Sequence, residues 1–501
     1  MTRATLCLLL STAGILSATG AAAQAPGAPG DDRFDRLLSA LVEQGVLTRQ
    51  KADAIAAELP APATAAPATS PVVTAPAPAL TLAAAQPEGG DRGGDPSISP
   101  SAPVVRNAAR ATAPDWTKRF KIDGDIRFRW QGEYFSNGTS KDIPNYNGLT
   151  GPTALPVTNL LGVDDRTRLR YRARFGFNAN VTDRVSAVLR LAVGNETEPV
   201  STDETLGDYF NRDDVVADRA YVRYAVNDQL VLFAGRMANP FYTTNMLWDG
   251  DVNPEGVAAT FERPLGAASL FATGGVFAVQ ENADRTKDRY LYAGQVGVEA
   301  VKLWEGASAK LGLAYYDYTN IEGRVGEPGT HNLVLQKGNT LIDIDPRAGF
   351  ILPALASRFR TLDLTGAVDQ TLGDHVLTAS FDLAKNLAYD ANRFRGQPLL
   401  TEPGGDLAWL VSLTYGTPKV ARRGDWQTTL SYRRIETDAV LAAFNEGDFN
   451  LGGTNTEGVV VDLVYGLTTN TSAQLTYMNT RSIVGPTYAF DALRMAFNTR
   501  F

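Results

Sequence analysis

One segment of the chain alternates arginine with apolar residues over ten positions. Residues 168–177 read RLRYRARFGF, so every second position up to Arg174 is arginine and the positions between them are leucine, tyrosine, alanine and phenylalanine. Side chains of a strand point alternately to its two faces, whereas a helix would scatter these arginines around its circumference. The segment therefore predicts a strand with one charged and one apolar face, and the fold must accommodate both faces.

This period-two pattern recurs along the chain after residue 115, in sixteen segments that we interpret as strands. Their approximate ranges are 120–134, 166–179, 184–194, 217–226, 229–236, 256–262, 268–279, 290–301, 307–318, 359–370, 375–385, 406–415, 425–435, 457–466, 472–480 and 488–501. All 14 prolines of residues 115–501 lie outside these segments, as the hydrogen bonding of a sheet requires.

The connections between the segments alternate in length. Those at 135–165, 195–216 and 237–255 are long, whereas those at 180–183, 227–228 and 263–266 are tight turns. An up-and-down barrel with long loops at one end and short turns at the other produces this alternation. We therefore predict an all-β protein, a 16-stranded antiparallel transmembrane β-barrel. A soluble propeller or sandwich is the alternative, but no motif repeats every 40–50 residues as propeller blades would.

Three segments with other compositions precede the barrel at residues 115–501. Residues 1–23 combine Arg3, a short apolar stretch and small residues before a cleavage point, which is typical of a signal peptide. Residues 24–60 contain two short stretches of helical periodicity, which predict a periplasmic helical hairpin. Residues 61–114 are rich in proline and alanine and predict a disordered linker.

Composition excludes several classes of function. The net charge of −8 argues against a nucleic-acid partner. One cysteine and two histidines leave little for a zinc site, and we expect no cofactor and no metal. Residues 249–253 read DGDVN and resemble the start of a calcium loop, but Pro254 occupies the position of the turn glycine. His331 and His375 are expected at opposite ends of the barrel, so we do not expect an enzyme.

Four stretches carry a resemblance to a known family. They are residues 37–48 (LLSALVEQGVLT), 234–241 (AGRMANPF), 247–251 (LWDGD) and 493–501 (LRMAFNTRF). With them the chain resembles the Gram-negative "putative porin" family. The last stretch, which ends in Phe501, is similar to the C-terminal signal read by the barrel-insertion machinery. The resemblance implies a diffusion channel in the bacterial outer membrane, surrounded by outer-membrane lipids and assembled as a homotrimer.

In a channel of this kind, inward-facing arginines would lie in a wet lumen and form a positive wall. We predict that this wall consists of Arg127, Arg129, Arg168, Arg170, Arg172, Arg174, Arg190, Arg223 and Arg236, and Arg219 belongs to the same pattern. The resemblance implies that the third long loop folds inward as a constriction loop and brings Trp248, Asp249, Asp251 and Glu255 opposite the wall.

The sequence therefore predicts passive diffusion of small hydrophilic solutes and ions, with a transverse field at the constriction. The arginines favour anions or weak selectivity, although the acidic loops act in the opposite direction. The alternative function is a structural or adhesive barrel that the N-terminal module and linker tether to the cell wall.

Overall fold

The structure is a computed structural model that describes residues 119–194, 198–282, 287–325 and 333–501. The predicted signal peptide (1–23), helical module (24–60) and linker (61–114) lie outside the described residues, as does His331. Among the described residues, no helix has the length and apolar character needed to cross a membrane.

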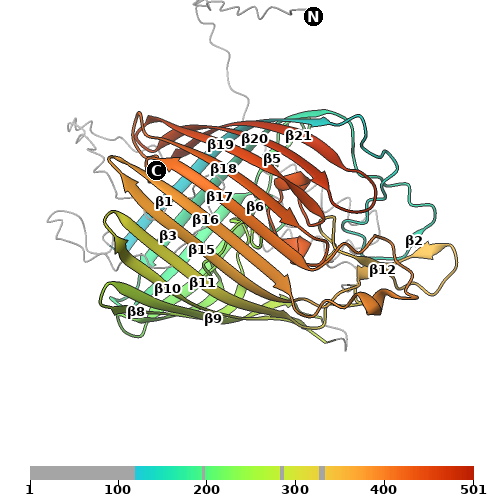
Figure 1. Cartoon of the computed structure of the whole chain (residues 1–501), viewed down its shortest axis with the longest axis horizontal. Coiled ribbons are helices and arrows are strands. Elements are labelled where there is room, and N and C mark those ends of the chain that lie inside the picture. Colours follow the sequence, from blue (N-terminus) through green and yellow to red (C-terminus); the bar gives the residue numbers. More distant parts are fainter. Residues whose placement is uncertain (1–118, 195–197, 283–286, 326–332) are drawn as a thin grey trace, which may run out of the picture. The chain divides into compact units, whose positions relative to one another are not determined.

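Sixteen long strands form one antiparallel sheet (Figure 1). Their bounds are β1 Phe120–Phe135, β3 Arg166–Asn180, β4 Val185–Val193, β6 Val215–Ala225, β7 Leu230–Arg236, β8 Glu255–Leu265, β9 Ala268–Gln280, β10 Arg289–Trp304, β11 Ala307–Tyr318, β15 Arg360–Leu372, β16 His375–Asn386, β17 Leu407–Gly416, β18 Trp426–Ile435, β19 Thr456–Thr468, β20 Thr471–Ser482 and β21 Ala489–Arg500. The predicted sixteen strands and antiparallel barrel are confirmed.

The long connections contain short strands and 3-10 helices. These are β2 Thr153–Ala154, β5 Glu204–Thr205, β12 Leu341–Asp343, β13 Phe350–Ile351, β14 Pro353–Leu355, η2 Ala391–Phe394, η3 Ala442–Phe444 and η4 Phe449–Leu451. Strand β5 pairs with β3, whereas β12 pairs with β14 and β13 with β2 outside the main sheet. In Figure 1 the labels β2 and β12 mark the end of the barrel that carries the long connections.

The first and last strands close the sheet into a barrel. β1 pairs with β3 on one edge and with β21 on the other, from Asp125 opposite Arg500 to Phe135 opposite Phe490. The backbones of Gly124 and Phe501 exchange two hydrogen bonds of 3.0 Å at the end of this seam. Closure pairs both edges that an open sheet would leave exposed.

One predicted boundary is wrong. We expected residues 263–266 to form the turn after the sixth strand, but β8 continues through Pro264 to Leu265. Pro264 pairs with Ser269 of β9, and it lies beyond Phe261, the last residue of β8 that pairs with β7. One edge of β8 has no neighbour there, so a proline that cannot donate to the ladder is tolerated.

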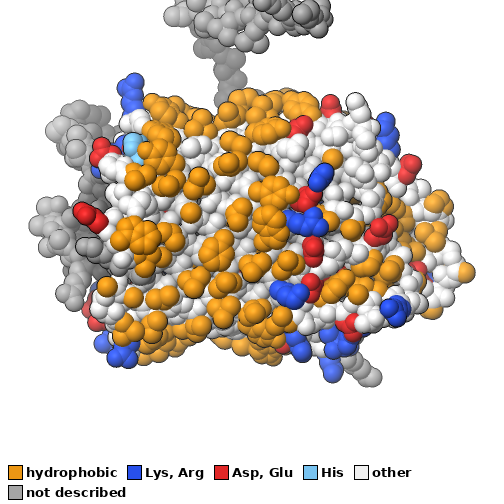
Figure 2. Space-filling view, viewed as in Figure 1, with side chains coloured by type: hydrophobic (Ala, Val, Ile, Leu, Met, Phe, Trp, Pro, Cys, Tyr) orange, Lys and Arg blue, Asp and Glu red, His pale blue; other side chains and the backbone are white. Residues whose placement is uncertain are grey.

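The strands separate apolar and polar side chains onto two faces, as the alternation predicts. The outer face exposes large apolar residues, among them Ile126, Phe128, Leu169, Phe175 and Phe177. Figure 2 shows such side chains covering a broad band of the barrel, between charged groups at the left rim and a line of charged groups near the middle of the view. This is the surface pattern of a barrel surrounded by lipid.

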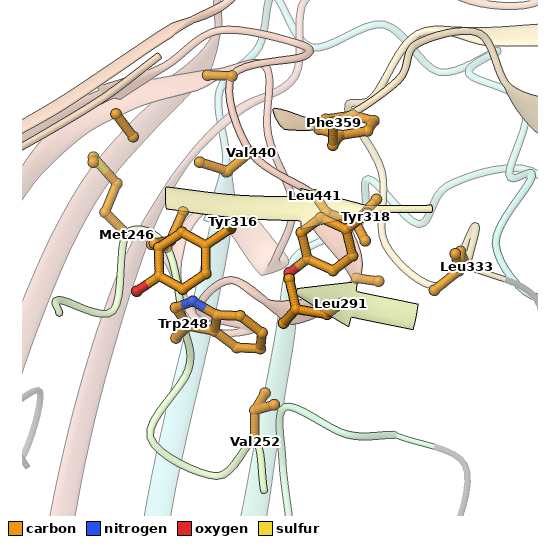
Figure 3. Close-up of a cluster of buried hydrophobic side chains, with 14 of the residues drawn as sticks. Met246, Trp248, Val252, Leu291, Tyr316, Tyr318, Leu333, Phe359, Val440 and Leu441 are labelled. Atoms are coloured by element: carbon orange, nitrogen blue, oxygen red, sulfur yellow. The ribbon is translucent and has the colours of Figure 1, made fainter. Parts of the chain in front are cut away.

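The main hydrophobic cluster lies inside the barrel, where connections pack against the inner wall (Figure 3). The connection between β7 and β8 contributes Met246 and Trp248, and β11 contributes Tyr316 and Tyr318. Val440 and other apolar residues come from the connection between β18 and β19. Long connections are therefore anchored in the lumen by burial of apolar side chains.

Candidate functional site

Seven arginines lie together on the inner faces of three adjacent strands. We call them the arginine ladder: Arg127 and Arg129 of β1, Arg168, Arg170, Arg172 and Arg174 of β3, and Arg494 of β21. The β1–β3 register places Arg127 directly opposite Arg172 and Arg129 opposite Arg170. Like charges directly opposite each other are destabilising, so the ladder requires carboxylates nearby.

Three connections each supply one carboxylate to the ladder. Asp203, between β4 and β5, binds Arg127 and Arg129, each at 2.5 Å. Asp251, between β7 and β8, lies 2.9 Å from Nη1 of Arg174.

The third carboxylate, Asp448, lies between β18 and β19 and accepts from Arg129 Nη1 at 2.7 Å. The wall itself adds Asp125, which Arg172 and Arg174 bind, and Glu133, which Arg168 binds. Five carboxylates therefore surround the seven arginines.

Because of these contacts, the arginines of the wall are less exposed to water than we expected. We expected the arginines to face open water, but Arg129, Arg172 and Arg174 are each 5% exposed. The connections that fold into the lumen cover them and replace water with carboxylate oxygens. Charge-assisted hydrogen bonds of this kind are stronger than neutral ones and hold the connections in place.

The connection of residues 237–254, which we call the 237–254 loop, folds into the lumen. Gln295 of β10 accepts from the Tyr242 amide at 2.8 Å and donates to the Tyr242 carbonyl at 2.6 Å. Farther along the loop, Thr244 donates to Asp382 of β16. Three predicted constriction residues lie here: Trp248, buried against Phe444, and the carboxylates Asp249 and Asp251.

A second connection, residues 436–455 or the 436–455 loop, also lies in the lumen and was not predicted. The Asp249 amide donates to the Phe444 carbonyl at 2.8 Å, and the Gly447 amide donates to Asp249 at 3.2 Å. Glu446 of this loop binds Arg433 of β18. The only local signal in the sequence is the pair Gly452–Gly453, which indicates an unusual backbone but not a direction.

Burial and charge act in opposite directions on the carboxylates of these connections. Burial alone would raise the pKa of Asp203 and of Asp448, but the ladder arginines hold the pKa of both well below its usual range. For Asp249, burial followed by the charge of Asp251 raises the pKa well above the ordinary value. Asp203 and Asp448 are therefore carboxylates at neutral pH.

Three further arginines continue along the wall. Arg190 of β4 binds Asp218 of β6, and Arg219 donates to the side-chain oxygen of Asn253 at 2.7 Å. Arg223 lies on the same face of β6 and opposite Phe233 of β7. These positions extend the positive wall from β3 to β6.

Arg236 and Glu255 do not belong to this wall. Arg236 pairs with Ala220 of β6 and shares the face of Leu232 and Ala234, which is the outer face of β7. It binds Glu255, and the two side chains are 36% and 56% exposed. The inner face of β7 holds Val231, Phe233 and Gly235, so the alternation that places the other arginines inside places Arg236 outside.

The calcium-like stretch uses its side chains in other contacts. Asp249 accepts backbone amides, Asp251 binds the ladder, and Asn253 binds Arg219 and Asp218. Within the described residues, no group of three or more histidine, cysteine, aspartate or glutamate side chains is arranged to hold a metal ion.

A family model described as "Putative porin" matches residues 98–501. A search of the curated proteins returns no match.

Solved structures also resemble the chain. The outer membrane channel DcaP of Acinetobacter baumannii is 11% identical with a TM-score of 0.39, over 76% of this chain and 97% of that one. OprB of Pseudomonas putida is 10% identical with a TM-score of 0.43, over 77% and 95%. OmpF of Salmonella typhi is 9% identical with a TM-score of 0.41, over 76% and 97%.

Proposed function

Because the chain belongs to the "Putative porin" family, we propose that it forms a channel in the bacterial outer membrane for passive diffusion of small hydrophilic solutes and ions. The closed barrel with an apolar outer face supports insertion into a bilayer. The ladder and its loop carboxylates support a polar path through the lumen. In this proposal the predicted N-terminal module is periplasmic and the barrels associate as a homotrimer.

One observation carries the proposal: a wall of arginines and two inward-folded loops meet inside one barrel. Arg172 and Arg174 lie on the wall, and Asp251 of the 237–254 loop lies against them. Fixed charges of opposite sign at a narrow place create a local field that orients water and dipolar solutes. Such a field favours polar solutes over apolar ones.

The same charges support weak preference for anions. The seven arginines of the ladder form ion pairs with five carboxylates, so the ladder together with its direct partners carries a net positive charge. Guanidinium groups remain protonated at every physiological pH. The net charge of the whole chain, −8, does not describe this local balance.

Planar-bilayer recording of the purified full-length protein tests the proposal. Stepwise increases in current after addition of the protein, absent with detergent alone, are the expected result. A folded and inserted barrel that carries no current at any salt concentration would contradict the channel function. The stepwise current reports an open aqueous path and does not depend on the identity of the solute.

A further inference from the structure

Asp448 occupies a site that the barrel wall builds. Arg129 Nη1 and Arg494 Nη1 approach its Oδ2 atom at 2.7 and 3.3 Å, and Arg494 Nη2 also donates to the Asp448 carbonyl at 2.8 Å. The two arginines come from β1 and β21, which are neighbours at the closing seam. Their side chains are only 6% and 4% exposed, so the site is rigidly enclosed on the side of the wall.

Asp448 differs from the other carboxylates that reach the ladder from connections. Its side chain is 32% exposed, whereas that of Asp203 is 1% and that of Asp251 is 11% exposed. Asp203 and Asp251 are therefore enclosed by the connections that carry them. Asp448 alone of these three has a substantial open side, and a solute in the lumen can approach its arginines from there.

The site also has unused donors. The Nε atoms of Arg129 and Arg494 are buried and have no hydrogen-bond partner within the described part of the chain. A buried donor without a partner carries a free-energy cost that an additional acceptor would remove. A guanidinium offers its donors in a planar fork, and a carboxylate presents two oxygens in matching geometry.

Apart from the Arg494 hydrogen bond to the Asp448 carbonyl, contacts outside the ladder hold the backbone around Asp448. Lys337 donates to the carbonyls of Asn450 and Gly452, and Asn445 exchanges two hydrogen bonds with Gly453. The Gly447 amide donates to Asp249 of the facing loop. Because these contacts do not involve the Asp448 carboxylate, its side chain can rotate away while the 436–455 loop stays in place.

We propose that Arg129 and Arg494 form a carboxylate-binding site in the lumen, which Asp448 occupies until a small carboxylate solute exchanges with it. The inference rests on the proposed channel function and adds a solute class to it. Exchange keeps both guanidiniums paired with a carboxylate, and it moves the displaced Asp448 toward lumen water, where its open side already lies. While Asp448 occupies the site it competes with the solute, so loss of its charge leaves the two arginines available to solute anions.

The test uses full-length protein in planar bilayers with acetate as the probe. Asp448→Asn removes the tethered carboxylate and keeps the size of the side chain. We expect the permeability of acetate relative to potassium to rise about fivefold, the factor given by a charge interaction of about 1 kcal/mol. An unchanged permeability ratio in conducting Asp448→Asn channels would overturn the exchange site.

Asp203→Asn is the matched control, since it removes the same charge next to Arg129 but at an enclosed position. Here we expect lower thermal stability without a comparable gain in acetate permeability. An equal gain in both variants would show a general charge effect and would also overturn the site.

The conductance of the wild-type protein provides a second test, which does not depend on the folding of a variant. Exchange at one site predicts that wild-type conductance saturates as potassium acetate is raised, whereas strict proportionality to concentration contradicts it. A wild type that carries no current contradicts the channel itself. A wild type that conducts without saturation contradicts only the site.

Discussion

Arg174 of β3 binds two carboxylates from different parts of the barrel: Asp251 of the 237–254 loop at 2.9 Å and Asp125 of β1 at 2.7 Å. A single guanidinium thus joins the wall, its neighbouring strand and the inward loop. Since Arg174 is 5% exposed, this joint lies almost entirely out of water. The Arg174 contacts therefore hold the 237–254 loop against the part of the inner wall formed by β1 and β3.

Arg174→Gln is expected to destabilise the barrel interior. The substitution leaves two carboxylates without this partner, and breaking a buried pair costs about 3–5 kcal/mol. We expect a value near the lower end, because Arg172 still contacts both Asp125 and Asp251. Denaturant unfolding in detergent measures the change, and a loss below about 0.5 kcal/mol would show that the joint contributes little.

Trp248→Ala is expected to loosen the 237–254 loop. The Trp248 ring stacks on that of Phe444 with 5.5 Å between the ring centroids, and its centroid lies 5.8 Å from that of Tyr316. Loss of the Trp248 side chain therefore leaves a cavity between the 237–254 loop and the 436–455 loop. Loss of a buried aromatic side chain costs about 3–5 kcal/mol. Single-channel recording should show added current noise and brief changes of conductance. Trp304→Ala is the control, because Trp304 lies at the end of β10 and is 55% exposed. Equal noise in both variants would count against the anchoring role.

Asp438 of the 436–455 loop should make stability depend on pH. It is fully buried and accepts the Thr340 amide at 3.0 Å, and burial raises its pKa from 3.8 to about 6. Between these values the Asp438 side chain binds more protons in the folded state than in the unfolded state. Its contribution to the free energy of unfolding therefore falls as pH rises from about 4 to 6 and is constant above about pH 6.

Asp438→Asn lacks this titration and provides the comparison. The stability of the wild type relative to the variant should fall by up to about 1.4 kcal/mol per pH unit within the window. Thermal unfolding of both proteins from pH 4 to 7 measures the difference. Parallel curves across this range would contradict the account.

Phe501→Ala is expected to lower the yield of folded barrel. The Phe501 ring lies 5.7 Å from that of Phe175, and a side chain on Gly124 would come within 2.6 Å of it. The ring therefore fills the space that glycine leaves at the closing seam. Phe497→Ala removes a similarly exposed ring from β21, and heat-dependent gel mobility measures both yields. Equal yields would show that the terminal position has no special part in closure.

The sequence predicts the barrel well because alternation is a local property of each strand. Residues 168–177 show the two faces without reference to any other part of the chain, and the same reasoning identifies the ladder positions on β1 and β3. The prediction for Arg236 was wrong because Arg236 was assigned to the wall as one more arginine in the series. Its position along β7, two residues after Ala234, already places it on the outer face.

The interior of the barrel was predicted only in part. Trp248 and Asp251 could be assigned to an inward loop through the family resemblance, whereas Asp448 and Glu446 could not. Their position depends on pairing between segments distant in sequence, such as Asp448 with Arg129. No periodicity records such a contact, because the 436–455 loop is irregular and is held by hydrogen bonds to side chains such as Asn339.

The reversal potential in a potassium chloride gradient tests the central claim most directly, that wall arginines and loop carboxylates jointly control ion passage. Asp251→Asn removes negative charge from the loop, and Arg219→Gln removes positive charge from the wall while retaining a donor for Asn253. The account predicts shifts of opposite sign from the wild type, toward anions for Asp251→Asn and toward cations for Arg219→Gln. Identical reversal potentials for the three proteins would contradict it.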